Sequence, residues 1–259
     1  MCIRDSSYLE PVGPRTAVPV VVDFQNLEVA RQRSFAADGD IAHRASAAVE
    51  ALKARWWEPR TARRAALCVA VTDHDAEVLR SWGARRVVVV PNAAEVEPCT
   101  PSPVDGPVTF FADHSYGPNA AASARLVRDV WPLVMAQRPS ARLRTCGRGT
   151  DDVVADPRTV FEAASMMVAP VERGAGTQLK VVEGLAHGRV VVATEHSARS
   201  APATARDACI STVDAADMAA AIVRLLDDVE DRQRRERAAR VQTWTDAMAP
   251  LLDAIDELT

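Results

Sequence analysis

The chain has 259 residues, 48% of them hydrophobic and 25% charged, a composition typical of packed globular proteins rather than of disordered chains. Its formal net charge of −4 argues against a broadly basic surface for nucleic acid. Its purely apolar runs are far shorter than the roughly 20 residues that span a bilayer. By the usual prior of about 100 to 200 residues per domain, the length suits two modest α/β domains.

The cysteines and histidines predict neither disulfides nor a metal site. Because the cysteines are odd in number and form no CxxC pair, they argue against a disulfide framework and structural zinc, and they favour a reducing, cytosolic compartment. The five histidines lack metal-ligand spacing, so no protein-bound metal is expected. The cysteines in question are Cys2, Cys68, Cys99, Cys146 and Cys209.

The first part of the chain predicts an incomplete α/β domain. Residues 1–16 contain no charged leader followed by an apolar segment, so they are not a signal peptide, and we expect a disordered or artificial start. Residues 17–94 alternate between strands and helices, which favours a partial Rossmann-like domain with three parallel strands. Its predicted strands are residues 17–24, 65–71 and 86–90, and its predicted helices are residues 40–57 and 73–83, the latter capped by Asp73.

A second α/β domain is predicted after a linker. Residues 95–107 contain four prolines and no periodicity, which is typical of an interdomain connection. Residues 108–240 resume the alternation, and residues 241–259 are expected to form a terminal helix. The strands expected in this second domain are 108–112, 141–146, 166–171 and 189–194, and the helices are 119–137, 160–164, 178–187 and 214–226.

The most informative segment is residues 165–196, which predict a strand, a glycine loop, a helix and a second strand. Ligands of open α/β sheets bind at the carboxyl ends of the strands, where this loop lies. Gly174 and Gly176 allow the backbone to approach a ligand closely, and Thr177 is a candidate N-cap of the helix. The free N–H groups and the helix dipole would then favour an anion.

The spacing within this helix sharpens the prediction. Leu179, Val182 and Ala186 are expected to form a buried stripe, which places Lys180 and Glu183 on another face. Lys180 is one of only two lysines among 31 cations, and in the first helical turn it runs against the dipole preference for an acid, which a bound anion would explain. Glu183 could accept hydrogen bonds from vicinal hydroxyls such as those of ribose. The pair therefore indicates a nucleoside diphosphate site.

Other interpretations of the segment remain open. The glycine loop could be a tight turn only, and Lys180 and Glu183 a solvated ion pair at i, i+3. Glu195, about twenty residues after Gly174, resembles the acidic residue that binds the ribose of NAD. The dinucleotide fingerprint, however, needs glycine where Leu179 stands, and no P-loop is present, so an NAD-dependent oxidoreductase is the runner-up.

Three stretches together resemble the group 1 (family four) glycosyltransferases of the GT-B fold. They are LCVAVTDHDAEVLRSWGARRVVVVPNAAE, VTFFADHSYGPNAAASARLVRDVWPLVMAQRPSARLRTCGRG and APVERGAGTQLKVVEGLAHGRVVVATEHSA. The resemblance implies an α/β fold of two Rossmann-like domains with parallel sheets, the N-terminal one incomplete. It also implies that the terminal helix of residues 241–259 packs back on the N-terminal domain. It also implies retaining transfer of a hexose from a nucleotide-diphosphate sugar to a hydroxyl acceptor, in cell-surface or exopolysaccharide synthesis.

The resemblance also implies roles for individual residues. Lys180 would neutralise the donor diphosphate, and Glu183 would match the second acid of the family's paired-glutamate motif. Glu172 is the nearest candidate for the first acid, although it lies eleven positions before Glu183 rather than the usual eight. The residues expected at the donor nucleotide are Gly174, Ala175, Gly176, Thr177, Gln178, Leu179, Lys180, Glu183, Gly147 and Arg148, and those expected along the cleft are Ala112, Asp113 and Asn119.

The implied partners are a nucleotide sugar and a glycan or lipid-linked acceptor, with peripheral membrane contact and without nucleic acid, metal or bound cofactor. Because nothing before Val18 supplies the family's first strands and glycine loop, a truncated donor-binding module without turnover is the alternative. Asp23, Asn26 and Glu28 could face the cleft or cap the next turn. Trp131 and Pro132 are expected to serve core packing rather than ligand stacking.

Overall fold

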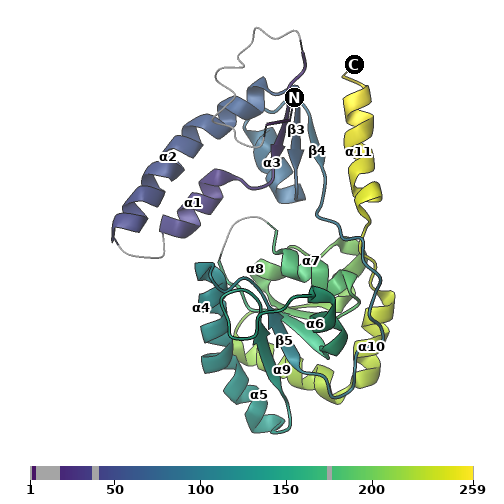
Figure 1. Cartoon of the computed structure of the whole chain (residues 1–259). Helices are drawn as coiled ribbons and strands as arrows, with labels where there is room; N and C mark the ends of the chain where they lie inside the picture. Colours follow the sequence, from purple (N-terminus) through teal and green to yellow (C-terminus); the bar gives the residue numbers. More distant parts are fainter. Residues whose placement is uncertain (1, 4–17, 37–40, 174–176, 259) are drawn as a thin grey trace. The chain divides into compact units, whose positions relative to one another are not determined.

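The computed structural model describes residues 2–3, 18–36, 41–173 and 177–258, which form two compact units (Figure 1). Unit 1 comprises residues 1–92, 174–177 and 244–259, and unit 2 comprises residues 93–173 and 178–243. Each unit is built on a parallel sheet with helical crossovers, so the predicted α/β fold class is confirmed.

Unit 1 contains a sheet in the order β1-β2-β3-β4, with all neighbouring strands parallel. It has four strands among the described residues, not the three expected, because Cys2–Ile3 pairs with Val21 and Val22. Part of residues 1–16, which were expected to be a disordered or artificial start, therefore belongs to the sheet. The strands are β1 (Cys2–Ile3), β2 (Val21–Phe24), β3 (Leu67–Ala70) and β4 (Val87–Val89).

The helices of unit 1 depart from the prediction in two places. A helix that the sequence did not indicate begins at Glu28, so this residue starts a helix instead of capping a turn. The cap of α3 is Thr72, whose hydroxyl accepts the Asp75 N–H at 3.0 Å, and not Asp73. The helices are α1 (Glu28–Ala36), α2 (Ile41–Arg64), α3 (Asp73–Ser81) and α11 (Trp244–Asp256).

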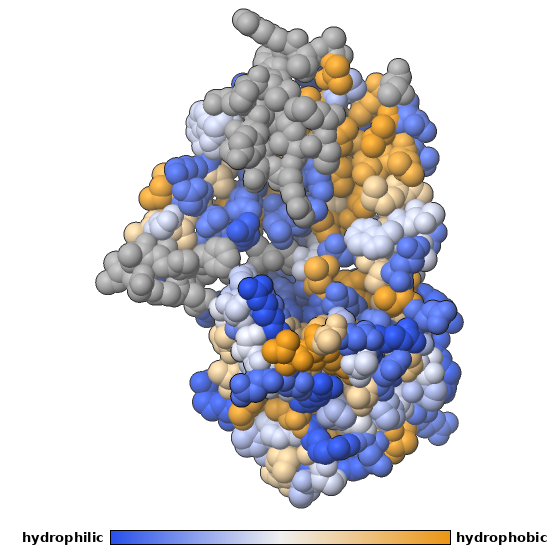
Figure 2. All heavy atoms as spheres, in the orientation of Figure 1, coloured by the Kyte–Doolittle hydropathy of each residue, from blue (hydrophilic) through white to orange (hydrophobic). Residues whose placement is uncertain are grey.

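The terminal helix α11 packs on β4 within unit 1. Arg86 donates to the Glu257 carboxylate at 2.5 Å and to the Ala254 carbonyl at 3.3 Å, and Ala247 and Ala254 are buried. On the face shown in Figure 2, hydrophobic side chains gather over α11 and β4, whereas most of the visible surface of unit 2 is hydrophilic.

Unit 2 contains a five-stranded parallel sheet in the order β6-β5-β7-β8-β9. Its strands are β5 (Val108–Phe111), β6 (Leu143–Cys146), β7 (Met166–Ala169), β8 (Val191–Thr194) and β9 (Cys209–Thr212), of which β9 was not predicted. The chain leaves β5 for β6 on one side and then crosses to β7 on the other side. The strand order therefore reverses at β5, between the carboxyl ends of β5 and β7.

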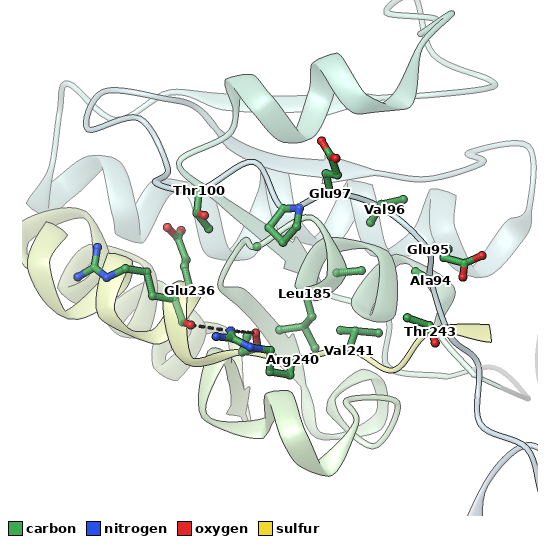
Figure 3. Close-up of a pocket in the computed structure, with 15 residues that line it drawn as sticks. Ala94, Glu95, Val96, Glu97, Thr100, Leu185, Glu236, Arg240, Val241 and Thr243 are labelled. Atoms are coloured by element: carbon green, nitrogen blue, oxygen red, sulfur yellow. Dashed lines mark hydrogen bonds between the residues drawn. The ribbon is translucent and has the colours of Figure 1, made fainter. Parts of the chain in front are cut away.

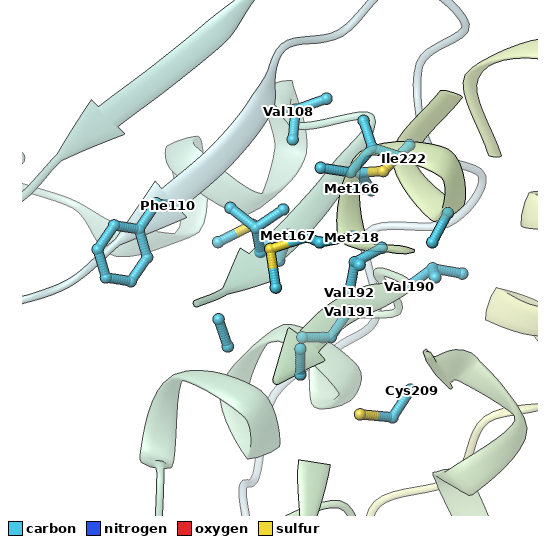
Figure 4. Close-up of a cluster of buried hydrophobic side chains, with 14 of the residues drawn as sticks. Val108, Phe110, Met166, Met167, Val190, Val191, Val192, Cys209, Met218 and Ile222 are labelled. Carbon is cyan, nitrogen blue, oxygen red and sulfur yellow. The ribbon is translucent and has the colours of Figure 1, made fainter. Parts of the chain in front are cut away.

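Helices and a buried core fix this sheet. Val108, Phe110, Met166, Val191 and their neighbours form one apolar cluster between strands and helices (Figure 4), and burial of this size is the main driving force for folding of the unit. Its helices are α4 (Gly117–Arg125), a π-helical stretch (Leu126–Val130), α5 (Trp131–Gln137), α6 (Pro157–Ala163), α7 (Leu179–Ala186), α8 (Glu195–Ala198), a 3₁₀ helix (Ala203–Ala208), α9 (Ala215–Asp227) and α10 (Val229–Ala238).

Two packing predictions for α5 have different outcomes. Trp131 is partly buried and packs against the apolar cluster of unit 2, as expected of a core residue. Pro132 is exposed, so the expectation that it packs in the core is wrong.

Candidate functional site

The candidate site lies in unit 2, at the carboxyl ends of β5 and β7. The loop of residues 112–116 follows β5 and leads to α4, while the chain after β7 leads to α7. Because the strand order reverses between these two strands, this is the position at which open α/β sheets bind their ligands. Lys180 on α7 and Asn119 on α4 meet there.

Lys180 lies in the first turn of α7 and is held by two neutral amides. Its Nζ donates to Asn119 Oδ1 at 3.0 Å and to Gln178 Oε1 at 2.8 Å. Burial lowers the pKa of Lys180 to about 8, and the negative charge of Glu183 opposes this shift. These two hydrogen bonds use two of the three N–H groups of an ammonium ion, so the third can donate to an anion.

The two amides are themselves fixed by other segments. Asn119 is buried, and its Nδ2 donates to the Asp113 carbonyl at 2.8 Å. Gln178 is also buried, and its backbone N–H donates to Ser200 Oγ at 2.8 Å. Segments that follow three different strands thus position a single ammonium group, as expected for a preorganised binding group rather than a solvated lysine.

Glu183 lies one helical turn after Lys180, as the spacing predicts. Its side chain is exposed, which leaves the carboxylate accessible to a ligand. Partial loss of hydration raises the pKa of Glu183, and the charge of Lys180 lowers it. No direct ion pair between the two is recorded in the described part of the chain, so the simple surface-pair interpretation does not account for Lys180.

Two expectations about the start of α7 are wrong. The residue before the helix is Gln178, not Thr177, and no side chain caps it. Leu179 is 52% exposed and therefore does not belong to the buried stripe, which consists of Val181, Val182, Leu185 and Ala186. The helix is rotated from the predicted orientation because Val181 rather than Leu179 packs against the sheet. Gly174, Ala175 and Gly176 lie outside the described residues.

Glu172, the candidate first acid, is engaged by an arginine of α4. Arg125 Nη1 lies 2.9 Å from Glu172 Oε1, and the glutamate is about half exposed. The pairing connects the chain after β7 with α4, the same two segments that Lys180 and Asn119 connect. Its negative charge is therefore partly neutralised before any ligand binds.

The remaining predicted residues line the ends of β5 and β6. Gly147 has φ +118°, and a Cβ there would lie 2.2 Å from the Ala112 carbonyl oxygen, so the glycine permits close approach of the two loops. Arg148 is highly exposed, 3.7 Å from Asp113 Oδ2. Hydrogen bonds from Ser115 lower the pKa of the Asp113 carboxyl. These residues adjoin Asn119, whereas Asp23 and Asn26 belong to unit 1.

Sequence reasoning missed two histidines of this region. His114 lies in the loop of residues 112–116 that follows β5, and His196 lies in α8, directly after β8. Burial lowers the pKa of each imidazole, and the charge of Lys180 lowers it further. The Nε2 atoms of both are buried without a hydrogen-bond partner among the described residues. Their positions directly after strands of the sheet could have indicated them, whereas the spacing between the histidines does not.

The backbone carbonyl of Cys146 adds to this polar environment in unit 2. In unit 1, the Thr177 hydroxyl is buried and lacks a partner within the described ranges. His114 hydrogen-bonds the Cys146 carbonyl, which leaves its other ring nitrogen for a ligand. Buried polar atoms are normally paired, so such groups mark a place where a polar ligand or water belongs.

A separate cavity of about 800 Å³ lies at the other end of α7 (Figure 3). It is lined by Leu185 and Ala186, by residues 94–100 and by the chain from Glu236 to Thr243. Its lining mixes glutamates and arginines around apolar side chains, so it indicates no single ligand class. It is distinct from the Lys180 region, because Lys180 is in the first turn of the helix and Leu185 in the last.

Within the described residues, no group of three or more His, Cys, Asp and Glu side chains could bind a metal ion. The helices described there are also too short or too polar for any of them to cross a bilayer. The candidate site consists of Lys180, the exposed Glu183, the amides of Asn119 and Gln178, and the imidazoles of His114 and His196.

Comparisons with known proteins identify the fold and one domain. Residues 108–228 match the family model described as glycosyl transferases group 1. No curated protein matches the chain in sequence. Among solved structures, TarM is similar with a TM-score of 0.74 at 12% identity, over 99% of this chain and 54% of its own. The chain thus spans about half the length of TarM.

Two further solved glycosyltransferase-type structures are similar to the chain in fold. Sucrose-phosphate synthase from Thermosynechococcus elongatus has a TM-score of 0.63 at 14% identity, over 98% of this chain and 71% of its own. Anabaena HepE in complex with UDP and glucose has a TM-score of 0.53 at 14% identity, over 93% of this chain and 70% of its own. Residues 108–228 are therefore similar to the group 1 glycosyltransferase domain, in a chain with the α/β fold of GT-B glycosyltransferases.

Proposed function

We propose that this protein is a glycosyltransferase that moves a hexose, with retention, from a nucleotide-diphosphate sugar to a hydroxyl acceptor. The observation that carries the proposal is the Lys180 ammonium group, held by Asn119 and Gln178 at the reversal of strand order. The match of residues 108–228 to group 1 glycosyltransferases supports it, since all these residues lie inside that range. The proposed acceptor is an intermediate of cell-surface or exopolysaccharide glycan synthesis.

In this mechanism Lys180 acts on the leaving group. As the bond between the anomeric carbon and the diphosphate oxygen breaks, negative charge grows on the diphosphate. A prepositioned ammonium group stabilises that charge without reorganisation in the transition state. The bond from the anomeric carbon to the diphosphate oxygen breaks, the bond from the anomeric carbon to the acceptor oxygen forms, and the proton of the acceptor hydroxyl passes to the departing diphosphate.

Glu183 and the backbone around residues 174–178 would position the donor. An exposed carboxylate one turn after Lys180 can accept hydrogen bonds from both ribose hydroxyls, which orients the nucleotide relative to the ammonium. We assign the glycine loop to the phosphates, Gly147 and Arg148 to the base, and Ala112 and Asp113 to the edge of the cleft. The His114 and His196 ring nitrogens would add neutral contacts.

UDP is the first ligand to test, because an S. aureus TarM mutant was solved with UDP, fondaparinux and alpha-GlcNAc-glycerol, and HepE with UDP and glucose. Calorimetric titration of UDP should give an affinity at least about tenfold weaker for Lys180→Ala than for the wild type, the loss expected for one charge-assisted hydrogen bond. Lys53→Ala is the matched control, because Lys53 is the other lysine and is exposed. Equal UDP affinities for the wild type and Lys180→Ala would refute the assignment.

Donor binding without turnover is the second candidate, and the Arg125–Glu172 ion pair favours it. A catalytic acid already neutralised by an arginine is less available to the substrate. Measuring UDP-sugar hydrolysis alongside UDP binding separates the two: binding with turnover that falls in Glu172→Gln supports the enzyme. Binding without any turnover supports the module. Stabilisation by NAD but not by UDP would revive the oxidoreductase hypothesis.

The proposed compartment is the reducing cytosol. The described cysteines Cys68, Cys99, Cys146 and Cys209 are free thiols, and burial raises the pKa of Cys68 and Cys209 to about 12. Thiols with such pKa values are almost entirely protonated and unreactive at neutral pH. The proposed acceptor is a glycan or a lipid-linked sugar, and no bound cofactor is required by the mechanism.

A further inference from the structure

The cavity at the last turn of α7 contains a buried carboxylate with an unsatisfied oxygen atom. Glu236 of α10 lines this cavity of unit 2 and is 2% exposed. Its Oε2 accepts the Ser102 N–H at 3.0 Å, whereas its Oε1 is buried and has no hydrogen-bond partner among the described residues. Figure 3 shows the carboxylate directed toward Thr100, another residue of the lining. Because buried polar atoms are normally paired, Oε1 indicates a hydrogen-bond donor that the described chain does not supply.

The other charged side chains of the lining are all exposed. They include Glu95 and Glu97, and Figure 3 shows the Glu97 carboxylate pointing away from the other labelled side chains. Arg240 donates through Nη1 to two backbone carbonyls of its own segment, at 2.6 and 2.7 Å. The mixed charges of the lining therefore face solvent and do not select a ligand, whereas the buried Glu236 does.

Two buried arginines compensate the charge of Glu236 without satisfying its Oε1. Arg189 and Arg232 are 1% and 0% exposed. Burial raises the pKa of Glu236, and the charges of these two arginines oppose that shift. In the described ranges, the hydrogen bonds of both guanidinium groups go to the Ser102 hydroxyl and to backbone carbonyls, and neither arginine lines the cavity. With Glu236 ionised, this buried cluster of two cations and one anion has a net positive charge.

This distribution of charge favours a neutral ligand. An anion would be repelled by the carboxylate that lines the cavity, and a cation would approach a buried cluster that is already positive. A neutral hydroxyl group satisfies Oε1 without bringing a further charge out of water. Its hydrogen bond to an ionised acceptor is also stronger than a bond between two neutral groups.

The size and the apolar part of the lining favour a sugar among neutral ligands. The cavity volume of about 800 Å³ far exceeds the roughly 30 Å³ of one water molecule and lies within the range of about 300–1,000 Å³ typical of small-molecule sites. Leu185, Ala186 and Val241 contribute apolar groups, and Thr100 and Thr243 contribute hydroxyls. A sugar ring carries hydroxyls along its edge and C–H groups on its faces, which matches this combination.

We propose that this cavity binds a neutral sugar, in which one hydroxyl donates to Glu236 Oε1 and a C–H face of the ring packs on Leu185 and Val241. The cavity is lined by residues 94–100, by the end of α7 and by residues 236–243, so a bound sugar would connect three segments of unit 2. The site is separate from Lys180, and the proposal does not depend on sugar transfer.

An NMR titration of the isotope-labelled full chain with methyl α-D-glucopyranoside tests the proposal. The amide resonances of residues 94–100, 185–188 and 236–243 should shift and reach saturation, with the affinity of about 1 mM expected of a few hydrogen bonds. Protonated glucosamine and glucuronate place a positive or a negative group on a similar ring. Each should bind at least about fivefold more weakly, because each brings an additional charge to the buried cluster.

Glu236→Gln tests the role of the carboxylate. It should weaken binding of the glucoside by about tenfold, because a charge-assisted hydrogen bond is replaced by a neutral one. Glu97→Gln is the matched control, since Glu97 is an exposed glutamate of the same lining and its replacement should leave the affinity unchanged. Because Glu236 also accepts the Ser102 N–H, urea denaturation is used to confirm that the variant is folded.

A second variant fills the cavity without removing a buried group. Val96 lines the cavity and is 40% exposed, so Val96→Trp should occupy part of the space and lower the affinity for the glucoside by at least about tenfold. Val104→Trp is its control, because Val104 is 57% exposed in the same connecting segment and does not line the cavity.

Four results would overturn the proposal. The first is no saturable shift in the lining residues at up to about 50 mM glucoside, which would leave water as the partner of Glu236. The second is a set of shifts confined to residues 112–119 and 180–183, which would assign the sugar to the Lys180 site. The third is tighter binding of protonated glucosamine than of the glucoside, which would make the cavity a cation site. The fourth is wild-type affinity in both Glu236→Gln and Val96→Trp.

Discussion

Helices α2 and α7 each contain one of the two lysines of the chain, and the two lysines differ in every physical respect. Lys53 on α2 is exposed and pairs with Glu50 at 2.6 Å, an i, i+3 surface pair worth a few tenths of a kcal/mol. Lys180 on α7 is held by two buried amides, and burial lowers its pKa to about 8. The comparison teaches that the presence of a lysine does not by itself indicate a site. A lysine that is buried without a carboxylate partner indicates one, because burying an unpaired charge is energetically costly.

The largest expected effect comes from disturbing the loops around Lys180. Gly147→Ala should lower the free energy of unfolding by about 2–4 kcal/mol, because φ +118° is strained for alanine and the new Cβ would meet the Ala112 carbonyl. Urea denaturation monitored by circular dichroism measures this change.

Gly117→Ala is the control for this substitution. A Cβ at Gly117 would meet no heavy atom within 4 Å, and alanine favours the first turn of α4. We expect a change of no more than about 0.5 kcal/mol there. If both variants unfold at the same urea concentration as the wild type, the close approach of the loops after β5 and β6 is not required for stability.

The next largest effect is a pH dependence of stability that we expect from Glu58, a buried residue of α2. Glu58 is 1% exposed and accepts the N–H groups of Glu28 at 2.6 Å and Val29 at 3.1 Å, which caps α1. Burial raises the pKa of Glu58 to about 7 from 4.5, despite these two hydrogen bonds. A raised folded-state pKa means that the stabilising contribution is complete below about pH 4.5 and is lost as the pH rises through about 7.

Glu58→Gln should remove this dependence, since glutamine does not titrate. Between about pH 5 and 7.5 the wild type should lose about 2 kcal/mol more stability than the variant, as the shift in pKa implies. Unfolding free energies measured in urea at several pH values compare the two. Parallel pH profiles would show that Glu58 ionises in the folded protein as readily as in the unfolded chain.

The smallest effect separates Lys180 from an ordinary surface lysine. With a pKa of about 8, Lys180 loses its charge at a lower pH than an ordinary lysine side chain, whose pKa is about 10.4. UDP affinity should therefore fall by about tenfold between pH 7 and 9.5, a range in which the terminal phosphate is already ionised. Calorimetric titration across this range measures it.

Lys180→Arg sharpens the test, because a guanidinium stays protonated throughout. Its UDP affinity should be nearly independent of pH over the same interval, whatever its absolute value. A wild-type affinity that is equally flat would show that the Lys180 charge does not take part in binding the diphosphate.

Local signals in the sequence were sufficient for most elements of unit 2. Apolar runs of four to six residues separated by amphipathic segments predicted β5, β6, β7 and β8. The helix predicted over residues 214–226 corresponds to α9, although Asp214 lies before this helix as its cap and accepts the Asp217 N–H at 2.9 Å. The prediction missed elements whose hydrophobic periodicity is weak. Strand β9 is only partly buried, and α1 has little amphipathic character, so neither stood out.

The sequence by itself determined the alternating α/β pattern and the placement of Lys180 and Glu183 one turn apart, because both depend on periodicity and chain order. Only the tertiary structure decided that Asn119, sixty-one positions away, contacts Lys180, that Arg125 engages Glu172 and that Leu179 faces outward. Strand order and helix rotation decide these contacts, and both follow from packing between distant segments, which periodicity within one segment does not encode.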